Sequence, residues 1–481
     1  MFPKIHKSNF APGMRAKMGL LHASTLIVFA LFAAAANAQT TGTTPPMDHS
    51  KMGMSQSTIV ADPLGVPMDR GGSGTTWIPD AVKLPTYSVM KGKWDLMLHG
   101  FVFAQYNTQE GKRGDNQFGS LNWGMFMASR DVKGGRFQAR TMLSIDAATV
   151  GPRGYPLLLQ SGELYNGESV HDRQHPHDFF MELGVTYERP IVRNIGIALY
   201  AAPSGEPALG PVAFMHRPSA MDLPTAPIGH HWQDATHVAF GVLSAGLFTN
   251  TMKLEGSVFN GREPDQHRWD FDRINLDSYS GRLSVNPNKN WALTAGYGFL
   301  KSPEALHPDE SVKRIVASAM YGREVGGDGQ WATTVVYGAN QHSEDVHSAL
   351  TLARDVELAL PARTHSVLLE SELVLDRRKT FFGRTEYVQK SADDLVLEFM
   401  NGGPYSDKVY VKTISLGYVR ELKTMRGATL GIGGMGTLNV LPPHLDKWYG
   451  TRTPVGALFF LRVRPVLQRG GMAMNMPGMK H

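Results

Sequence analysis

Polar and apolar residues alternate along most of the chain between Trp94 and Pro465. Successive side chains of a β-strand point to opposite faces, so this alternation predicts strands with one apolar and one polar face. The stretch 251–260 shows the pattern with little interruption, because apolar Met252, Leu254 and Val258 alternate with polar Lys253, Glu255 and Ser257.

About 16 segments of this kind, each of roughly 9–13 residues, are long enough for strands that cross a bilayer. We place them at 94–106, 121–129, 136–147, 178–188, 194–202, 235–248, 251–260, 278–286, 291–299, 312–322, 330–340, 364–375, 379–389, 409–419, 428–439 and 454–464.

The connections between these segments alternate between short turns, such as 249–250, and long polar loops, such as 148–177 and 203–234. A transmembrane barrel sorts its turns and loops to opposite rims in this way. A soluble sandwich or propeller would also alternate, but it has no reason to sort its loops, and no blade-length repeat is visible. We therefore predict an all-β chain whose residues 94–465 form an antiparallel transmembrane β-barrel of about 16 strands. An even strand number places both termini on the periplasmic side of a bacterial outer membrane.

The N-terminal residues are typical of a secretory signal peptide. Basic Lys4, Lys7 and Arg15 precede an apolar run at 20–32, and Ala36-Asn37-Ala38 provides a small-residue cleavage site. We predict a signal peptide at 1–38, with an N-terminal membrane anchor as the alternative. The following residues, 39–93, are rich in Pro, Gly and Thr and predict a flexible periplasmic arm.

Composition excludes several other classes of protein. The chain has no Cys, which rules out disulfides, thiolate metal sites and a lipid anchor on Cys. No apolar run after the signal reaches the ~20 residues of a spanning helix. The net charge of +5 comes without a basic stripe interleaved with aromatic residues, so we expect no nucleic-acid partner.

Methionine and histidine gather at both ends of the mature chain, in Met47, His49, Met52 and Met54 and in Met472, Met474, Met476, Met479 and His481. Thioethers are soft ligands that suit Cu(I) or Ag(I), and imidazole also suits Cu(II). A solvated tail, here 466–481, gives Met nothing to pack against, so these residues predict metal-binding tails. The alternative is incidental Met in a low-complexity segment. The pattern allows a copper ion and makes no cofactor obligatory.

The run Met47-Asp48-His49-Ser50-Lys51-Met52-Gly53-Met54 resembles the Met/His repeats of outer-membrane and periplasmic copper-resistance proteins, including the copper resistance protein B family. The resemblance covers about ten residues at each end of the chain. It implies a Met-rich arm joined to an outer-membrane barrel, with lipid, metal ions and periplasmic copper-handling proteins as partners.

Two of the long loops hold a second group of candidate metal ligands. His171, His175, His177 and Asp178 end one loop, and His216, His230 and His231 lie in the next, together with Met215 and His237. His175 and His177 flank Pro176, and an extended backbone there puts both imidazoles on one side. Asp178 could ligate or orient an imidazole. The alternative is a polar loop that folds into the barrel and narrows its pore.

Enzyme motifs are poor, and we predict no enzyme. Gly431–Gly436 fits the dinucleotide pattern G-x-G-x-x-G, but it lies within a strand pattern with no helix to follow. We expect its glycines to ease strand curvature or the close approach of another element. The sequence therefore favours an outer-membrane channel involved in copper handling or resistance. A general porin whose tails only sequester metal, and an outer-membrane hydrolase with its site at the rim, are the alternatives.

Overall fold

The computed structural model describes residues 60, 62–343, 363–392, 394–397, 408–425 and 427–467, with the backbone alone at 162 and 163. All of them belong to one compact unit, Ser57–His481. The tail residues Met47, His49, Met52, Met54, Met472, Met474, Met476, Met479 and His481 lie outside the described residues.

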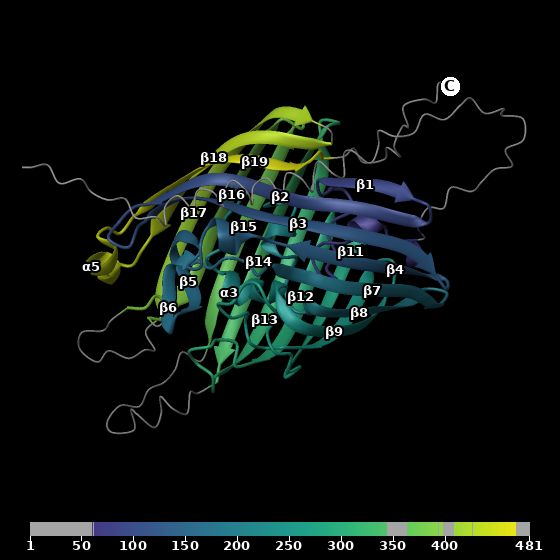
Figure 1. Ribbon diagram of the computed structural model, residues 1–481, viewed down its shortest axis with the longest axis horizontal. Coiled ribbons are helices and arrows are strands. Elements are labelled where there is room, and N and C mark those ends of the chain that lie inside the picture. The colour runs from purple at the N-terminus through teal and green to yellow at the C-terminus, as the bar shows by residue number, and fades with distance from the viewer. Residues whose placement is uncertain are drawn as a thin grey trace, which may run out of the picture. The chain divides into compact units, whose positions relative to one another are not determined.

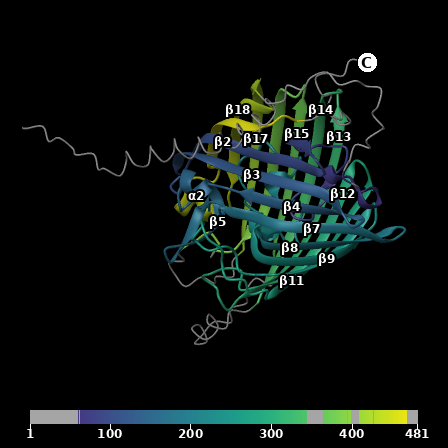
Figure 2. The ribbon, with the colours of Figure 1, turned by 45° about the vertical axis from the view of Figure 1, so that its right-hand side comes forward.

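Sixteen of the described strands form one closed antiparallel ring, in which each strand pairs with the next along the chain and β19 pairs back with β2 (Figure 1). They are β2(Trp94–Gln109), β3(Asn116–Val132), β4(Gly135–Leu143), β7(Phe180–Val192), β8(Ile195–Gly205), β9(Ala239–Phe248), β10(Met252–Phe259), β11(Ser278–Asn288), β12(Trp291–Lys301), β13(Ser311–Val325), β14(Gly329–His342), β15(Thr364–Leu375), β16(Lys379–Lys390), β17(Val409–Met425), β18(Ala428–Val440) and β19(Val455–Pro465). In Figure 2 the front strands β3, β4, β7 and β8 slant across the rear strands β13, β14 and β15, as tilted strands of a barrel do.

Each predicted segment corresponds to one of these strands, so the fold class is confirmed. The short turns, such as 193–194 and 289–290, lie at one rim of the barrel, and the long loops lie at the other. The largest difference in length is at β3, which begins at Asn116 rather than 121 because its N-terminal half stays paired with β2 beyond the predicted span.

The two faces of the wall divide as the alternation predicts. Leu254 on β10 is 63% exposed on the outer face, while its neighbours Lys253 and Glu255 are buried inside. The same division holds at β7, where Leu183 is exposed and Glu182 is buried. An apolar exterior around a closed ring of strands is the arrangement that satisfies every backbone hydrogen bond in lipid, so the barrel is a multi-pass barrel of the outer-membrane type.

The glycine run at Gly431–Gly436 lies within β18, as expected for a strand rather than a nucleotide-binding turn. A Cβ atom at Gly433 would overlap the ring of Phe460 on β19. The glycine therefore makes room for an aromatic side chain that points into the barrel.

The segment before the barrel folds back against the inside of the wall. It contains η2(Pro63–Gly65), η3(Met68–Arg70) and β1(Thr86–Lys91), and β1 pairs with the first residues of β2. Arg70 donates to the carbonyl of Asn250, and Ala81 donates to that of Lys289, both in short turns. From the sequence we expected a flexible arm up to residue 93. The described part, 62–91, is instead held at the short-turn rim by bonds to the turns and to wall side chains, such as those between the Lys83 backbone and the Gln330 amide.

The connection between β8 and β9, residues 206–238, runs through the barrel interior, and we call it the plug segment. It contains η4(Phe214–His216), α3(His230–Gln233) and η5(Ala235–His237), and nearly all of its residues are buried. The other long connections carry α2(Asp146–Thr149), the hairpin β5(Tyr155–Tyr165) and β6(Glu168–Gln174), η6(Pro443–Leu445) and α5(Asp446–Tyr449). None of the helices in the described residues is long and apolar enough to cross a membrane.

Candidate functional site: a histidine cluster inside the barrel

Polar side chains of the wall hold the plug segment in place. Ala208 donates its amide proton to Ser257 on β10 at 2.8 Å, and the Trp232 indole donates to Thr364 on β15 at 2.7 Å. Arg217 pairs with Glu370, and Asp222 pairs with Arg462, so charges of the plug meet opposite charges of the wall. The interior is therefore packed, and these polar contacts fix the plug segment to the wall.

Five of the described histidines lie next to one another where the plug segment meets the end of the preceding long loop. The ring centroids of His230 and His237 are 5.1 Å apart, those of His177 and His237 are 5.5 Å apart, and those of His230 and His231 are 5.7 Å apart. His175 lies at the edge, with its ring 6.4 Å from that of His231. We call these five residues the imidazole cluster. The ring of Phe214 packs against three of them.

Oxygen atoms hold the Nδ1 atom of three rings in the imidazole cluster. His177 Nδ1 lies 2.8 Å from Asp146 Oδ2, and His230 Nδ1 lies 2.7 Å from Asp234 Oδ1, one helical turn away. His237 Nδ1 donates to the carbonyl of Asp234 at 2.8 Å. Metal-binding histidines commonly donate Nδ1–H to a carboxylate or carbonyl in this way, which leaves Nε2 for the ion. The Nε2 atom of His237 is buried and has no hydrogen-bond partner among the described residues.

The carboxylates that orient these rings are fixed in turn. Asp146 begins α2 and accepts the amide proton of Asn122 at 2.8 Å. Asp234 accepts from Arg217 at 2.9 Å. The nearby charge of Arg217, helped by the hydrogen bond from His230, outweighs burial and holds the pKa of Asp234 below its ordinary value. It is therefore ionised at neutral pH.

Burial favours the uncharged form of three rings in the imidazole cluster, those of His175, His230 and His237. It lowers the pKa of His237 to about 3, and the neighbouring His230 and His177 add to the effect. Burial also lowers the pKa values of His175 and His230. A metal ion binds the neutral form of imidazole, so these rings are in the state that ligation requires.

The ring nitrogens of the cluster are not gathered around one point. Among the described residues, the exposed or half-buried Asp265, Asp270 and Asp272 alone bring three ligand atoms of His or carboxylate type within 4.8 Å. An ion at the imidazole cluster would therefore first meet one or two imidazoles, and rotation of further side chains would complete its coordination.

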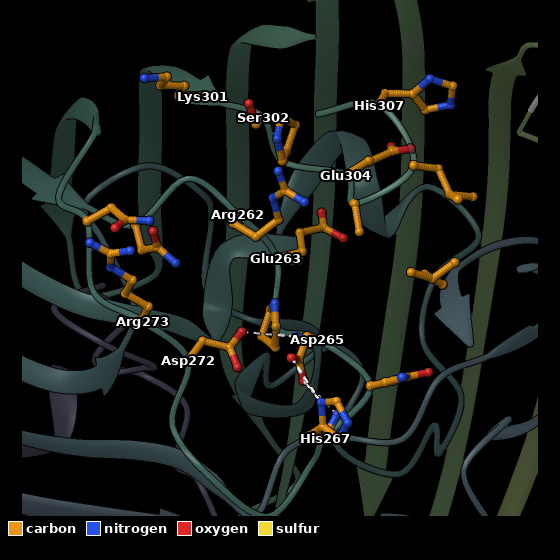
Figure 3. A pocket seen from close by; sticks show the side chains of 18 of the residues that line it. Arg262, Glu263, Asp265, His267, Asp272, Arg273, Lys301, Ser302, Glu304 and His307 are labelled. Carbon is orange, nitrogen blue, oxygen red and sulfur yellow. Dashed lines mark hydrogen bonds and ion pairs between the residues drawn. The ribbon is translucent and has the colours of Figure 1, made fainter. Parts of the chain in front are cut away.

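A polar pocket of about 630 Å³ leads from the long-loop rim to this cluster, and it reaches His231 and Glu263 (Figure 3). Glu263 Oε1 lies 3.3 Å from His231 Nδ1. The described residues that line the pocket include seven carboxylates and three Lys or Arg side chains. The carboxylates are Glu263, Asp265, Asp270, Asp272, Asp277, Glu304 and Asp394. Such an excess of negative charge raises the local concentration of cations. We call this pocket the acidic vestibule.

The structure brings together four of the histidines that the sequence singled out, His175, His177, His230 and His231. It separates three other candidates from them. His171 pairs with Asp172 at 2.8 Å, beside Arg113. Asp178 accepts from Arg268 at 3.0 Å, which occupies the carboxylate that we expected to ligate or to orient an imidazole. His216 lies deeper in the barrel, beside Met142.

Sequence reasoning missed the groups that orient the rings. Asp146 is 31 residues from His177 and comes near it only in the folded chain, whereas Asp234 is four residues from His230 and could have been found from that spacing. Glu263 belongs to a loop two strands further along the chain. His237 lies close to His230 and His231 in the sequence. This closeness was the signal that could have identified it as a member of the cluster.

No family model matches the chain, and no curated protein matches it. Solved structures of outer-membrane barrels are similar to it. Salmonella typhi OmpF, solved in complex with daunomycin, shares 12% identity at a TM-score of 0.46, over 78% of this chain and all of that chain. Pseudomonas putida OprB shares 10% sequence identity at a TM-score of 0.44, over 78% of this chain and 94% of that chain. Acinetobacter baumannii OccAB2 shares 10% sequence identity at a TM-score of 0.37, over 77% of this chain and 97% of that chain. At TM-scores below 0.5 these likenesses add nothing to the barrel assignment, which rests on the strand pairing.

Proposed function

We propose that this chain is an outer-membrane barrel that takes up transition-metal ions, copper above all, through the acidic vestibule and the imidazole cluster. The observation that carries the proposal is the set of five neighbouring imidazoles inside the barrel, three of them oriented through Nδ1 by oxygen atoms. Imidazole suits divalent copper and zinc, whereas carboxylates alone would favour Mg²⁺ or Ca²⁺.

A general porin accounts less well for the interior. Diffusion of small solutes needs a water-filled lumen, as in porins. Here the plug segment crosses the lumen, and Arg217 and Asp222 fix it to opposite charges of the wall. We infer that solutes do not pass freely and that an ion moves through ligands rather than through bulk water. The role is one of binding and transport without catalysis.

Copper is favoured over zinc by the two tails. The Met residues among 47–54 and 472–479 offer soft sulfur ligands, which zinc does not prefer. The sequence places these tails on the periplasmic side, and the long loops would then face the cell exterior. In this orientation the vestibule collects ions outside, the tails collect them inside, and periplasmic copper-handling proteins are the expected recipients.

Binding to the purified full chain in detergent tests the proposal. We expect the double variant His177→Gln with His237→Gln to weaken Cu(II) binding by at least tenfold in titration calorimetry. Glutamine is close to histidine in size and keeps a polar amide N–H in this surrounding, while the ring nitrogens that would ligate are lost. The matched control is His365→Gln on β15, where His365 bonds to the Tyr337 hydroxyl away from the cluster. Equal Cu(II) affinities of the wild-type chain, the double variant and the control would overturn the role of the cluster.

A cellular measurement tests the transport role. We expect a deletion strain to differ from its parent in copper accumulation and copper tolerance, and the double variant to complement it less well than His365→Gln does. Single-channel recordings in planar bilayers should show low conductance for the wild-type chain. A large, steady, ion-unselective conductance together with unchanged copper handling would leave the general porin as the function.

A further inference from the structure

A second group of soft ligands lies deeper in the barrel and belongs to neither the imidazole cluster nor the tails. His99 on β2 is directly opposite Met125 on β3, and Met125 is directly opposite Met142 on β4. All three side chains are buried on the inner face. Directly opposed residues on neighbouring strands have Cβ atoms ~4.5–5.5 Å apart, so an imidazole and two thioethers form one row.

The plug segment places a second imidazole over this row. His216 Nε2 lies 3.4 Å from Met142 Sδ, and the His216 ring centroid lies 5.3 Å from that of His99. Trp123 packs beside both rings, with centroid distances of 4.6 Å to His216 and 4.8 Å to His99.

His99 is prepared for ligation by its backbone partner. Its Nδ1 lies 2.6 Å from the carbonyl oxygen of Pro85. A carbonyl only accepts, so Nδ1 carries the proton and Nε2 keeps its lone pair. The side chain is 2% exposed, and Nε2 has no hydrogen-bond partner among the described residues. A buried acceptor without a donor costs stability, so its retention favours a role that uses the lone pair.

We propose that His99, Met125, Met142 and His216 form a buried site for a soft monovalent metal ion, Cu(I) or Ag(I). The site contains no carboxylate, and two neutral nitrogens with two thioethers match the preference of such ions. The proposal does not depend on ion binding at the imidazole cluster. It assigns the barrel two binding positions, one near the vestibule for divalent ions and one at the wall of β2, β3 and β4 for monovalent ions.

Methionine methyl NMR of the full chain in detergent tests this site. The chain is labelled at the methionine methyl carbons and titrated with Ag(I), which is soft, monovalent and redox-inert. Single Met→Leu variants assign the resonances of Met125, Met142 and, as a matched control from the same buried cluster, Met435 on β18. We expect the Met125 and Met142 resonances to shift together and Met435 to stay unchanged. The tail methionines are followed separately in the same spectra.

The variant His99→Gln supplies the decisive comparison, since Gln is close to His in size and keeps a polar amide N–H but offers no ring nitrogen. We expect the Ag(I) response of Met125 and Met142 to weaken at least tenfold in this variant. Unchanged Met125 and Met142 resonances in the wild-type chain at tenfold Ag(I) excess would overturn the proposal, as would a full response in His99→Gln. These NMR measurements are independent of the Cu(II) titration of the double variant His177→Gln with His237→Gln. Each experiment can therefore overturn one site and leave the other standing.

Discussion

Arg217 of the plug segment and Glu370 on β15 form an ion pair with an Nε–Oε1 distance of 2.6 Å, and neither side chain is exposed. Arg384 on β16 pairs with the second oxygen of Glu370 at 3.2 Å, and Asp234 accepts from Arg217 on the plug side. The pair therefore connects the wall to the carboxylate that orients His230. The position of the imidazole cluster depends on this contact.

We expect Arg217→Met to loosen the plug while the barrel itself stays folded. Removing one partner of a buried ion pair leaves uncompensated charge and costs about 3–5 kcal/mol. The strand ring does not need Arg217, so the loss should fall on the plug and raise single-channel conductance. The control is Arg377→Met, which removes a half-exposed pair with Asp328 in a short turn. Equal conductance of the two variants would contradict a plug held by this contact.

Two substitutions on β10 test the assignment of the faces. Leu254 is on the lipid side, and an Arg there should destabilise the folded barrel by ~2–4 kcal/mol at mid-membrane depth. Ser257 faces inward and accepts the amide proton of Ala208 in the plug segment, so Ser257→Arg should displace the plug and leave the barrel foldable. Denaturant unfolding in lipid, read by heat-modifiable gel mobility, compares them. The facing assignment fails if both variants lose the same stability.

The buried histidines predict that the plug loses stability in acid. Burial lowers the folded pKa of His237 to about 3, whereas the unfolded chain binds this proton near pH 6.5. Between these values the unfolded segment holds more protons than the folded one. The stability that the plug gains from holding His237 uncharged is complete above about pH 6.5, and it is lost as the pH falls toward 3. We expect conductance to rise on acidification through this window, and less steeply in His237→Gln. A pH-independent conductance would contradict it.

The acidic vestibule should speed the arrival of cations. Asp270 and Asp272 lie in its wall, so the double change Asp270→Asn with Asp272→Asn removes two charges from the route to Glu263. We expect the association rate of Cu(II) to fall at low salt and the difference to shrink as salt screens it. Glu110→Gln, an exposed carboxylate on another long loop, serves as the control. Stopped-flow measurement across salt concentrations should find that control unchanged.

The wall could be predicted from the sequence, and the interior could not. A strand such as β10 meets lipid on one face and polar groups on the other. Its residues are therefore alternately apolar and polar, and this pattern is visible in the sequence. The plug segment meets both polar wall side chains, such as Glu370, and apolar ones, such as Phe101 and Met142. Its residues therefore show no period, and Ala208 and Trp232 are buried alongside Asp222. The inner-face position of His99 does not show in the sequence, because the residues around it, 96–103, are almost continuously apolar, and its partner His216 comes from the plug.

The tails remain a prediction from the sequence. β19 ends at Pro465, and Val466 still donates its amide proton to the carbonyl of Gly427, so removal of 468–481 should leave the barrel folded. The removed residues include Met472 and Met476, whose thioethers carry no proton to lose. We therefore expect the truncated chain to bind less Cu(I) at neutral and at mildly acid pH, with Cu(II) binding at the imidazole cluster unchanged.

Joint removal of 47–54 and 468–481 tests whether the two tails share an ion. The strands that carry them, β2 and β19, are neighbours in the ring and meet at the short-turn rim. If one ion bridges both tails, either deletion should remove most of the added Cu(I) affinity, and the second should remove little more. Additive losses, measured by competition with a Cu(I) chelator, would mean two independent sites. Cu(I) affinity equal to that of the tailless barrel would end the role of the tails and leave the buried ligands of the barrel as its metal sites.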